Sequence, residues 1–230
     1  MKTIGLLGGM SWESTTLYYQ LINQGVKKRL GGLHSAQIAM VSVDFHDVEE
    51  LQVKNDWAAA GQLLAEAGRQ VQAAGADFLV ICTNTMHIVA PTIQAAIDIP
   101  ILHIADATAR RINSRGIQTI GLLGTNFTME EGFYKDRLRD AYGLDVLVPN
   151  QADRRIVHDI IYDELVLGQV KDSSRSEYLR IIRDLQQRGA QGVIEGCTEI
   201  VMLVQQQHTD VPLFDTTAIH AEAAVLQALS

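Results

Sequence analysis

Two short polar segments, Thr83-Asn84-Thr85 and Cys197-Thr198-Glu199, stand directly after apolar runs and carry groups that can exchange protons or bind a carboxylate. A helix that begins at such a corner offers free backbone N–H groups and the positive end of its dipole, which suit an anionic ligand. The same field lowers the pKa of a thiol and raises its thiolate fraction. We therefore expect Cys197 to be a reactive cysteine, with an inert buried cysteine as the alternative.

The elements that would position these segments alternate between short apolar runs and longer amphipathic stretches. Apolar residues recur at three- and four-residue steps in Trp57–Ala74 and Ser176–Arg188, which predicts helices, and Gly75 and Gly189 follow them as C-terminal stops. This alternation predicts βαβ units with parallel sheets. The predicted strands are Thr3–Leu7, Gln37–Val43, Phe78–Cys82, Ile101–His103, Thr119–Leu123, Leu144–Val148, Gly192–Glu195 and Leu213–Phe214.

An internal repeat organises the chain. Thr3–Gly8 recurs letter for letter as Thr119–Gly124. Two further pairs follow in the same order, Gly75-Ala76 with Gly189-Ala190 and Ile99-Pro100 with Val211-Pro212. Three ordered pairs indicate two copies of one α/β unit.

The repeat predicts an α/β fold of two pseudo-symmetric, doubly wound parallel-sheet domains that face each other across a cleft. Open parallel sheets bind ligands at the carboxyl ends of their strands, so both polar segments are expected at that cleft. The expected first domain comprises residues 1–98 plus 210–230, and the expected second domain comprises residues 99–209.

The repeat also aligns the two polar segments. The Gly-Ala landmarks, Gly75 and Gly189, lie 114 residues apart, and this offset places Thr83 opposite Cys197. An offset of 115 would instead place Cys82 there, and the repeat alone does not decide between the two. Successive strand side chains point to opposite faces, so only one of Cys82 and Thr83 can share the orientation of Cys197.

Composition excludes several classes of protein. Acidic residues outnumber basic ones by 27 to 19, a net charge of −8, which argues against nucleic acid or an anionic membrane as partner. Apolar runs such as Phe78–Cys82 are far too short to span a bilayer. Two cysteines, Cys82 and Cys197, are too few for a disulfide scaffold or a Cys-rich zinc site. We expect a cytoplasmic protein.

Three segments, Gly8-Gly9-Met10, Thr83-Asn84-Thr85-Met86-His87 and Gly196-Cys197-Thr198-Glu199, resemble the aspartate/glutamate racemase family over essentially the whole chain. This resemblance implies a cofactor-independent, homodimeric enzyme with two pseudo-symmetric α/β domains. Family members usually carry a cysteine at both strand ends. The second cysteine falls on Cys197 and the first on Thr83, a departure that resembles the L-aspartate/glutamate-specific subgroup with a threonine–cysteine pair.

The resemblance implies that Cys197 and Thr83 are the catalytic pair and act on opposite faces of the substrate α-carbon, with Cys197 as the base for the L-enantiomer. A threonine hydroxyl is a far weaker acid than a thiol, so we expect low turnover in both directions. Racemisation develops enolate charge, which donors aimed at the α-carboxylate stabilise. The expected substrate-binding residues at these corners and at the first loop are Met10, Ser11, Asn84, Thr85 and Thr198.

The substrate side chain is less closely determined. In the family, basic residues hold the distal carboxylate, including an arginine in the loop after the second strand, whereas Asp44–Lys54 contains none. Gln52 could donate a hydrogen bond and Lys54 or His46 could supply charge, or all three could be solvated loop residues. Aspartate and/or glutamate is the expected substrate, and a broader amino-acid specificity is the alternative.

Other site types receive less support. Gly5–Gly9 lacks the G-x-G-x-x-G spacing of a dinucleotide site, and no two of His87, His103, His158 and His220 have a helical metal-ligand spacing. We therefore expect neither a cofactor nor a metal. The remaining alternatives are a dicarboxylate isomerase or decarboxylase that uses strand-end cysteines, and a non-catalytic amino-acid-binding module. Only the catalysts need a reactive thiol, so inactivation of turnover by iodoacetamide would discriminate.

Overall fold

The computed structural model describes residues 1–230 and divides into two compact units. Unit 1 consists of Met1–Ile104 and Thr217–Ser230, and unit 2 of Ala105–Thr216. Each unit contains one wholly parallel sheet, which is the doubly wound α/β architecture predicted from the repeat. Both boundaries lie a few residues after those expected from the sequence. The first is displaced because Ile101 bridges Leu79 of unit 1, and the second because Leu213–Asp215 pairs with a strand of unit 2.

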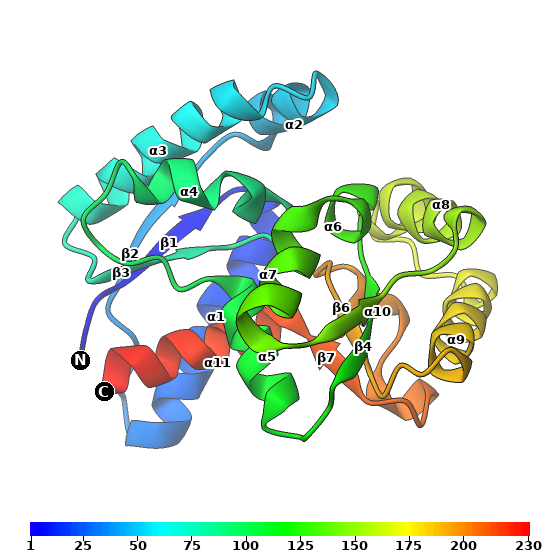
Figure 1. The fold of residues 1–230 in the computed structure, drawn as a ribbon. Helices are drawn as coiled ribbons and strands as arrows, with labels where there is room; N and C mark the ends of the chain where they lie inside the picture. Colours follow the sequence, from blue (N-terminus) through cyan, green and yellow to red (C-terminus); the bar gives the residue numbers. More distant parts are fainter. The chain divides into compact units, whose positions relative to one another are not determined.

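Unit 1 is a three-stranded sheet in the order β2-β1-β3, with β1 at its centre. All five residues of β1 are buried, as expected for a central parallel strand covered on both faces. In Figure 1, α2, α3 and α4 cover one face of this sheet, and α1 and α11 cover the other. The elements of this unit are β1 (Ile4–Gly8), α1 (Trp12–Leu30), β2 (Ile38–Ser42), α2 (Phe45–Val53), α3 (Trp57–Ala73), β3 (Phe78–Ile81), η1 (Thr85–Val89), α4 (Ala90–Gln94) and α11 (Thr216–Leu229).

Strand alternation divides unit 1 into two apolar cores. Leu79 and Ile81 of β3 pack on the α3 face together with Leu64 and Val71, which recur at helical spacing along α3. Phe78, Val80 and Cys82 belong to the core on the opposite face, with residues of α1 and α11. The side chain of Cys82 therefore points away from the face on which Leu79 and Ile81 lie.

Unit 2 is a four-stranded sheet in the order β5-β4-β6-β7, with β4 and β6 in the middle. Residues of α8, α9 and α10 form the core on one face, and α5 and α7 lie on the other (Figure 1). The elements are α5 (Ile104–Asn113), β4 (Thr119–Leu123), α6 (Asn126–Glu130), α7 (Gly132–Tyr142), β5 (Asp145–Leu147), α8 (Gln151–Ile160), η2 (Ile161–Leu165), α9 (Asp172–Gln187), β6 (Val193–Glu195), α10 (Ile200–Leu203), η3 (Gln206–His208) and β7 (Leu213–Asp215).

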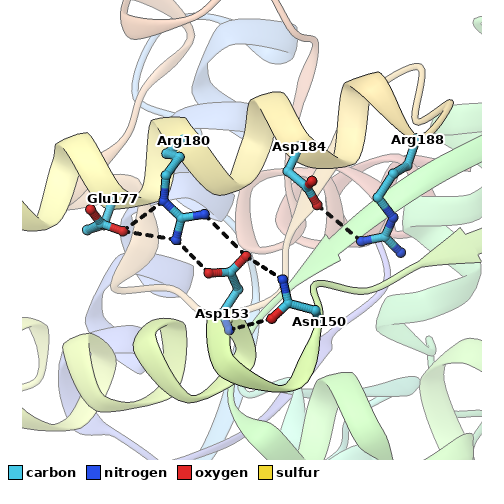
Figure 2. A network of polar contacts seen from close by, with 6 residues as sticks. All are labelled: Asn150, Asp153, Glu177, Arg180, Asp184 and Arg188. Atoms are coloured by element: carbon cyan, nitrogen blue, oxygen red, sulfur yellow. Dashed lines mark hydrogen bonds and ion pairs between the residues drawn. The ribbon is translucent and has the colours of Figure 1, made fainter.

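A polar network joins α8 to α9 within unit 2 (Figure 2). Arg180 of α9 donates to the carboxylate of Asp153 on α8 with an Nη2–Oδ1 distance of 2.5 Å, and it also pairs with Glu177. Asn150, the N-cap of α8, accepts a hydrogen bond from the backbone N–H of Asp153. The Arg180 guanidinium lowers the pKa of Asp153, because it stabilises the ionised carboxylate. This network aligns the two helices that cover the sheet carrying Cys197.

The two sheets repeat one another in detail. The backbone N–H of Leu79 donates to Pro100 O at 2.9 Å, and that of Val193 donates to Pro212 O at 2.8 Å. In unit 2 this contact belongs to the β6–β7 pair. In unit 1 the predicted strand Ile101–His103 is reduced to an isolated bridge between Ile101 and Leu79. Both units therefore have the same strand order, and the fourth strand of unit 1 is reduced to a single bridge.

No helix in the structure combines the length and the apolar composition that crossing a membrane requires.

Candidate active site

The corner after β6 carries Cys197. Strand β6 ends at Glu195, and the backbone N–H of Gly196 still donates to Leu123 O at 2.7 Å, which keeps the chain in register up to the cysteine. Cys197 is partly buried, and its Sγ donates a hydrogen bond to Oε2 of Glu199 at 2.8 Å. Thr198 lies between them and is also partly buried. The thiol and the carboxylate therefore form an acid–base pair.

The protonation of Cys197 differs from the expectation of a lowered thiol pKa. Burial and the negative charge of Glu199 raise the pKa of the Cys197 thiol well above its ordinary value, as does the hydrogen bond to that carboxylate. The backbone N–H groups of Glu199 and Thr198 act in the expected direction and lower this pKa, but they are outweighed. The helix that follows, α10, is only four residues long and its dipole is correspondingly small. The resting side chain is a thiol whose proton has a nearby acceptor.

The corner after β3 carries Thr83. The chain passes from β3 through the half-buried Thr83 into the 3₁₀-helix η1, which begins at Thr85. His87, inside η1, binds Thr83 O through Nδ1 at 2.8 Å, and its backbone N–H donates to Asn84 O at 3.1 Å. Asn84 is buried, whereas Thr85 is half-buried. Thr83, Asn84 and Thr85 thus belong to one tightly held turn.

Strand pairing decides which residue of unit 1 is equivalent to Cys197. Gly5 of β1 pairs with Leu79, and its repeat counterpart Gly121 of β4 pairs with Val193. Leu79 and Val193 lie 114 residues apart, and the same offset relates Thr83 to Cys197. Cys82 lies on the opposite face, where burial raises the pKa of its thiol.

The first loop contains Met10 and Ser11. Met10 is buried in the α3-side core, and Ser11 is the N-cap of α1, with its hydroxyl accepting from Ser14 N–H at 3.3 Å. Close packing requires glycine at the two positions before them, Gly8 and Gly9. A Cβ at Gly8 would lie 2.3 Å from a methyl carbon of Thr15, and Gly9 has a positive φ of 96° with its Cβ position 2.1 Å from a backbone oxygen. The loop is shaped by close packing against α1 and β2.

Gln52 lies in α2, so the segment after β2 that the sequence suggested as a loop is mostly helical. Its side chain is buried and its Nε2 donates to Sδ of Met86 at 2.8 Å, which brings Gln52 beside the Thr83 corner. Lys54 and His46 instead pair with Glu50 on the exposed side of the same helix. Of the three suggested polar side chains, Gln52 is the one directed toward the other candidate residues of unit 1.

The candidate residues are thus distributed over both units. The six that unit 1 contains are Met10, Ser11, Gln52, Thr83, Asn84 and Thr85. Unit 2 contains Cys197 and Thr198.

Sequence reasoning missed two titratable groups, Glu199 and Glu195, whereas His87 lies in the quoted motif as a candidate for orienting the site. Glu199 follows Cys197 by two residues in the quoted motif, and only its side-chain position reveals it as the thiol's partner. His87 lies four residues after Thr83, a spacing that brings its ring back to the Thr83 carbonyl. Glu195 is 4% exposed although it is a carboxyl group, and a single glutamate in the apolar run Gly192–Glu195 was the available signal.

The structure contains no cluster of three or more His, Cys, Asp or Glu side chains arranged to hold a metal ion. Its three buried imidazoles, His87, His103 and His220, are instead engaged with backbone groups, with Tyr18 or with one another.

Comparison with known proteins shows which family this chain resembles in sequence and in fold. The sequence pattern of the Asp/Glu/hydantoin racemase family matches residues 7–224. A crystal structure of a candidate Asp/Glu racemase from Yersinia pestis is 56% identical, with a TM-score of 0.96 over 100% of both chains. An aspartate racemase homologue from Pyrococcus horikoshii OT3 is 31% identical, with a TM-score of 0.86 over 100% of both chains.

A curated relative from Bacillus subtilis (strain 168), the broad specificity amino-acid racemase RacX, is 20% identical over 96% of both proteins. The family match spans almost the whole chain, including both strand-end segments. The chain therefore belongs to the Asp/Glu/hydantoin racemase family, and its enzyme class is that of the amino-acid racemases.

Proposed function

We propose that this enzyme racemises aspartate and/or glutamate without pyridoxal phosphate, by transferring α-protons between the substrate and the pair Cys197 and Thr83. The observation that carries this proposal is the equivalence of the two residues: each follows the strand that pairs with the repeated β1 or β4 segment, at the same register position. A duplicated α/β unit supplies two similar corners, and racemisation needs two groups with opposite approaches to one carbon.

The L-to-D direction begins at Cys197. Glu199 accepts the thiol proton across the 2.8 Å hydrogen bond, and the resulting thiolate removes the α-proton of the L-substrate. The electron pair left on the α-carbon delocalises into the α-carboxylate, which Asn84, Thr85 and Thr198 bind together with neighbouring backbone N–H groups. Thr83 then donates its hydroxyl proton to the opposite face. Solvent returns a proton to Thr83, and Glu199 releases to solvent the proton that it took from the thiol, so both groups regain their starting states. Each step moves one proton and leaves the oxidation state unchanged.

The D-to-L direction runs the same steps backwards. The thiol of Cys197 is already protonated in the resting enzyme, so it is ready to donate to the carbanion. Thr83 must now remove the α-proton, which is the harder step because an alkoxide is a costly intermediate. Enantiomers have equal free energies in water, so kcat/KM must be equal in the two directions, and kcat and KM can differ between the two directions only by the same factor.

Met10 and Ser11 close the site from the first loop, and Gln52 donates a hydrogen bond to the distal carboxylate of the substrate. The burial of Gln52 and its contact with Met86 support this role, because they hold its amide beside the Thr83 turn. A neutral donor binds a carboxylate less strongly than an arginine. A broader amino-acid specificity is therefore the second candidate function, and the relative named as a broad specificity racemase favours it.

The chemistry also bears on assembly and location. Cys197 must stay reduced to exchange protons, which favours a reducing compartment such as the cytoplasm. We infer a homodimer, as the family resemblance implies, and sedimentation at micromolar concentration would test it.

The decisive experiment is α-proton exchange in deuterated water without added cofactor, across L- and D-forms of aspartate, glutamate and several neutral amino acids. We expect deuterium in both enantiomers of the acidic substrates together with loss of optical activity. Exchange with neutral amino acids at comparable rates would favour the broader specificity. Exchange with none of them would overturn the proposal.

A further inference from the structure

Three buried imidazoles gather inside unit 1 next to the Thr83 turn. The ring of His87 lies 4.5 Å from that of His103 and 5.9 Å from that of His220, measured between ring centres. His103 directly precedes Ile104, where the chain leaves unit 1, and His220 follows Thr217, where it returns. The cluster therefore connects the candidate catalytic turn to both ends of the chain's excursion into unit 2.

The hydrogen bonds of His87 determine its tautomer. Nδ1 faces the carbonyl oxygen of Thr83 at 2.8 Å, and a carbonyl can only accept, so Nδ1 carries a proton. Nε2 lies 3.2 Å from the backbone N of Ile104, whose N–H donates to it, so Nε2 carries none. The ring is neutral with its proton on Nδ1. Burial lowers the pKa of His87 well below its ordinary value, and the neighbouring His103 and His220 act in the same direction.

The backbone segment that ends at Ile104, which bonds to Nε2 of His87, is fixed by hydrogen bonds of its own. Leu102 O accepts a hydrogen bond from Nε2 of His220 at 2.7 Å, and Nδ1 of His220 lies 2.8 Å from the hydroxyl of Tyr18. Tyr18 belongs to α1 and is 1% exposed, so this chain of contacts ends in the core. These hydrogen bonds fix the position of the segment from Leu102 to Ile104. Because His87 bonds both to Ile104 of this segment and to the carbonyl of Thr83, it links the turn that carries Thr83 to a fixed part of the core.

We propose that His87 is a positioning residue for Thr83: by donating from Nδ1 to the Thr83 carbonyl while Nε2 accepts from Ile104, it sets the position from which the Thr83 hydroxyl reaches its face of the substrate. This inference rests on the proposed function, because it assigns His87 to the Thr83 half of the reaction and leaves the Cys197 half untouched. His87 itself touches no substrate.

Two substitutions at His87 each keep one of its two ring hydrogen bonds and remove the other. His87→Asn places an amide donor where Nδ1 lies and keeps the bond to Thr83 O, but it loses the one to Ile104. His87→Gln reaches the position of Nε2 and keeps an acceptor for Ile104 N–H, but it loses the bond to Thr83 O. Both variants remove the imidazole and leave an amide, so their effects on burial are similar. His34→Gln, at an exposed histidine, is the matched control.

The readout separates the two halves of the reaction in deuterated water. Cys197 alone can exchange the α-proton of an L-substrate and return deuterium to the same face, whereas inversion needs Thr83. For His87→Gln we expect inversion to fall by roughly 100-fold, the cost of misplacing a reacting group by about 1 Å, while deuterium still enters the L-substrate near the wild-type rate. His87→Asn should recover most of the inversion, and His34→Gln should retain both signals.

Equal loss of exchange and inversion in both His87 variants would mean a purely structural role and would overturn the proposal, as would unchanged inversion in His87→Gln. If the wild-type enzyme exchanges no amino acid, the proposed function itself fails. A second measurement needs no variant: long-range ¹H–¹⁵N correlations of the histidine rings should show His87 neutral with its proton on Nδ1 between pH 6 and pH 8. A charged ring, or a proton on Nε2, would contradict the assignment.

Discussion

The Sγ atom of Cys197 lies 2.8 Å from Oε2 of Glu199 and donates its proton toward that carboxylate. This pair gives the candidate base a built-in proton acceptor, so Cys197 need not be a thiolate at rest. A protonated thiol is also less prone to oxidation and alkylation than a thiolate. The charge of the pair is one negative unit whether the proton sits on sulfur or on oxygen, so moving it costs little long-range electrostatic energy.

Removing the thiol tests the assignment of the base. Cys197→Ala should abolish both inversion and deuterium incorporation into L-aspartate, because no other group in the proposed site serves that face. Mass spectrometry of the recovered amino acid measures this, and a thermal melt by circular dichroism checks that the variant folds. Deuterium in L-aspartate after incubation with this variant would contradict the role of Cys197.

Changing the acceptor tests the pair. Glu199→Gln should lower kcat for the L-substrate by about 10²-fold or more, the usual contribution of a general base, because glutamine cannot take the thiol proton. In the same variant the thiol pKa should fall, since the carboxylate charge that disfavours the thiolate is gone. Iodoacetamide should therefore label Cys197 faster than in the wild type at pH 8.

Glu199→Asp is the matched control, because it keeps the charge but shortens the reach. It should leave the rate of labelling by iodoacetamide close to the wild-type rate. Faster turnover together with slower labelling in Glu199→Gln would be the reverse of both expectations and would remove Glu199 from the mechanism.

Strengthening the acid on the other face tests Thr83. Thr83→Cys should raise turnover of the D-substrate, because a thiolate forms far more readily than an alkoxide. The rise in kcat/KM must be equal in the two directions. Cys82→Ala is the control: Cys82 lies in the core between β3 and the helices α1 and α11, so this variant should lose stability by about 1 kcal/mol and keep its turnover.

A loss of activity in Thr83→Cys would count against the two-face arrangement. A loss of activity in Cys82→Ala, with the fold intact, would instead indicate that the neighbouring cysteine takes part.

The pH dependence of stability tests the buried carboxyl group of Glu195. Burial, together with the charge of Asp215 opposite it on β7, raises the pKa of Glu195 to about 8, from 4.5 in an exposed glutamate. Between these values the folded chain holds a proton that the unfolded chain has lost. The free energy of unfolding should therefore fall as pH rises through this range, by at most about 1.4 kcal/mol per pH unit from this group.

Glu195→Gln cannot ionise and should flatten that part of the curve, whereas Glu131→Gln, at an exposed glutamate, should not. Urea unfolding at pH 5.5, 7.0 and 8.5 measures the difference. Parallel curves for Glu195→Gln and the wild type would show that Glu195 is ionised at neutral pH.

Much of the fold can be predicted from the order of residues alone. The letter-for-letter repeat of Thr3–Gly8 at Thr119–Gly124 and the alternation of apolar and amphipathic stretches indicate two doubly wound parallel sheets, because these patterns are local. The same patterns place Thr83 and Cys197 directly after buried strands. Helix α3 was predicted to within one residue from its apolar spacing.

Tertiary structure decided the remainder, since it depends on contacts between distant residues or on side-chain direction. The choice between Thr83 and Cys82 required the pairing of Gly5 with Leu79 and of Gly121 with Val193. The raised thiol pKa of Cys197 required its burial and the direction of the Glu199 side chain, which outweigh the helix N–H groups that a motif makes visible. Sequence thus determines which groups stand at the ends of strands, whereas packing determines which proton each of them holds, because a protonation state is set by neighbours and solvent exposure.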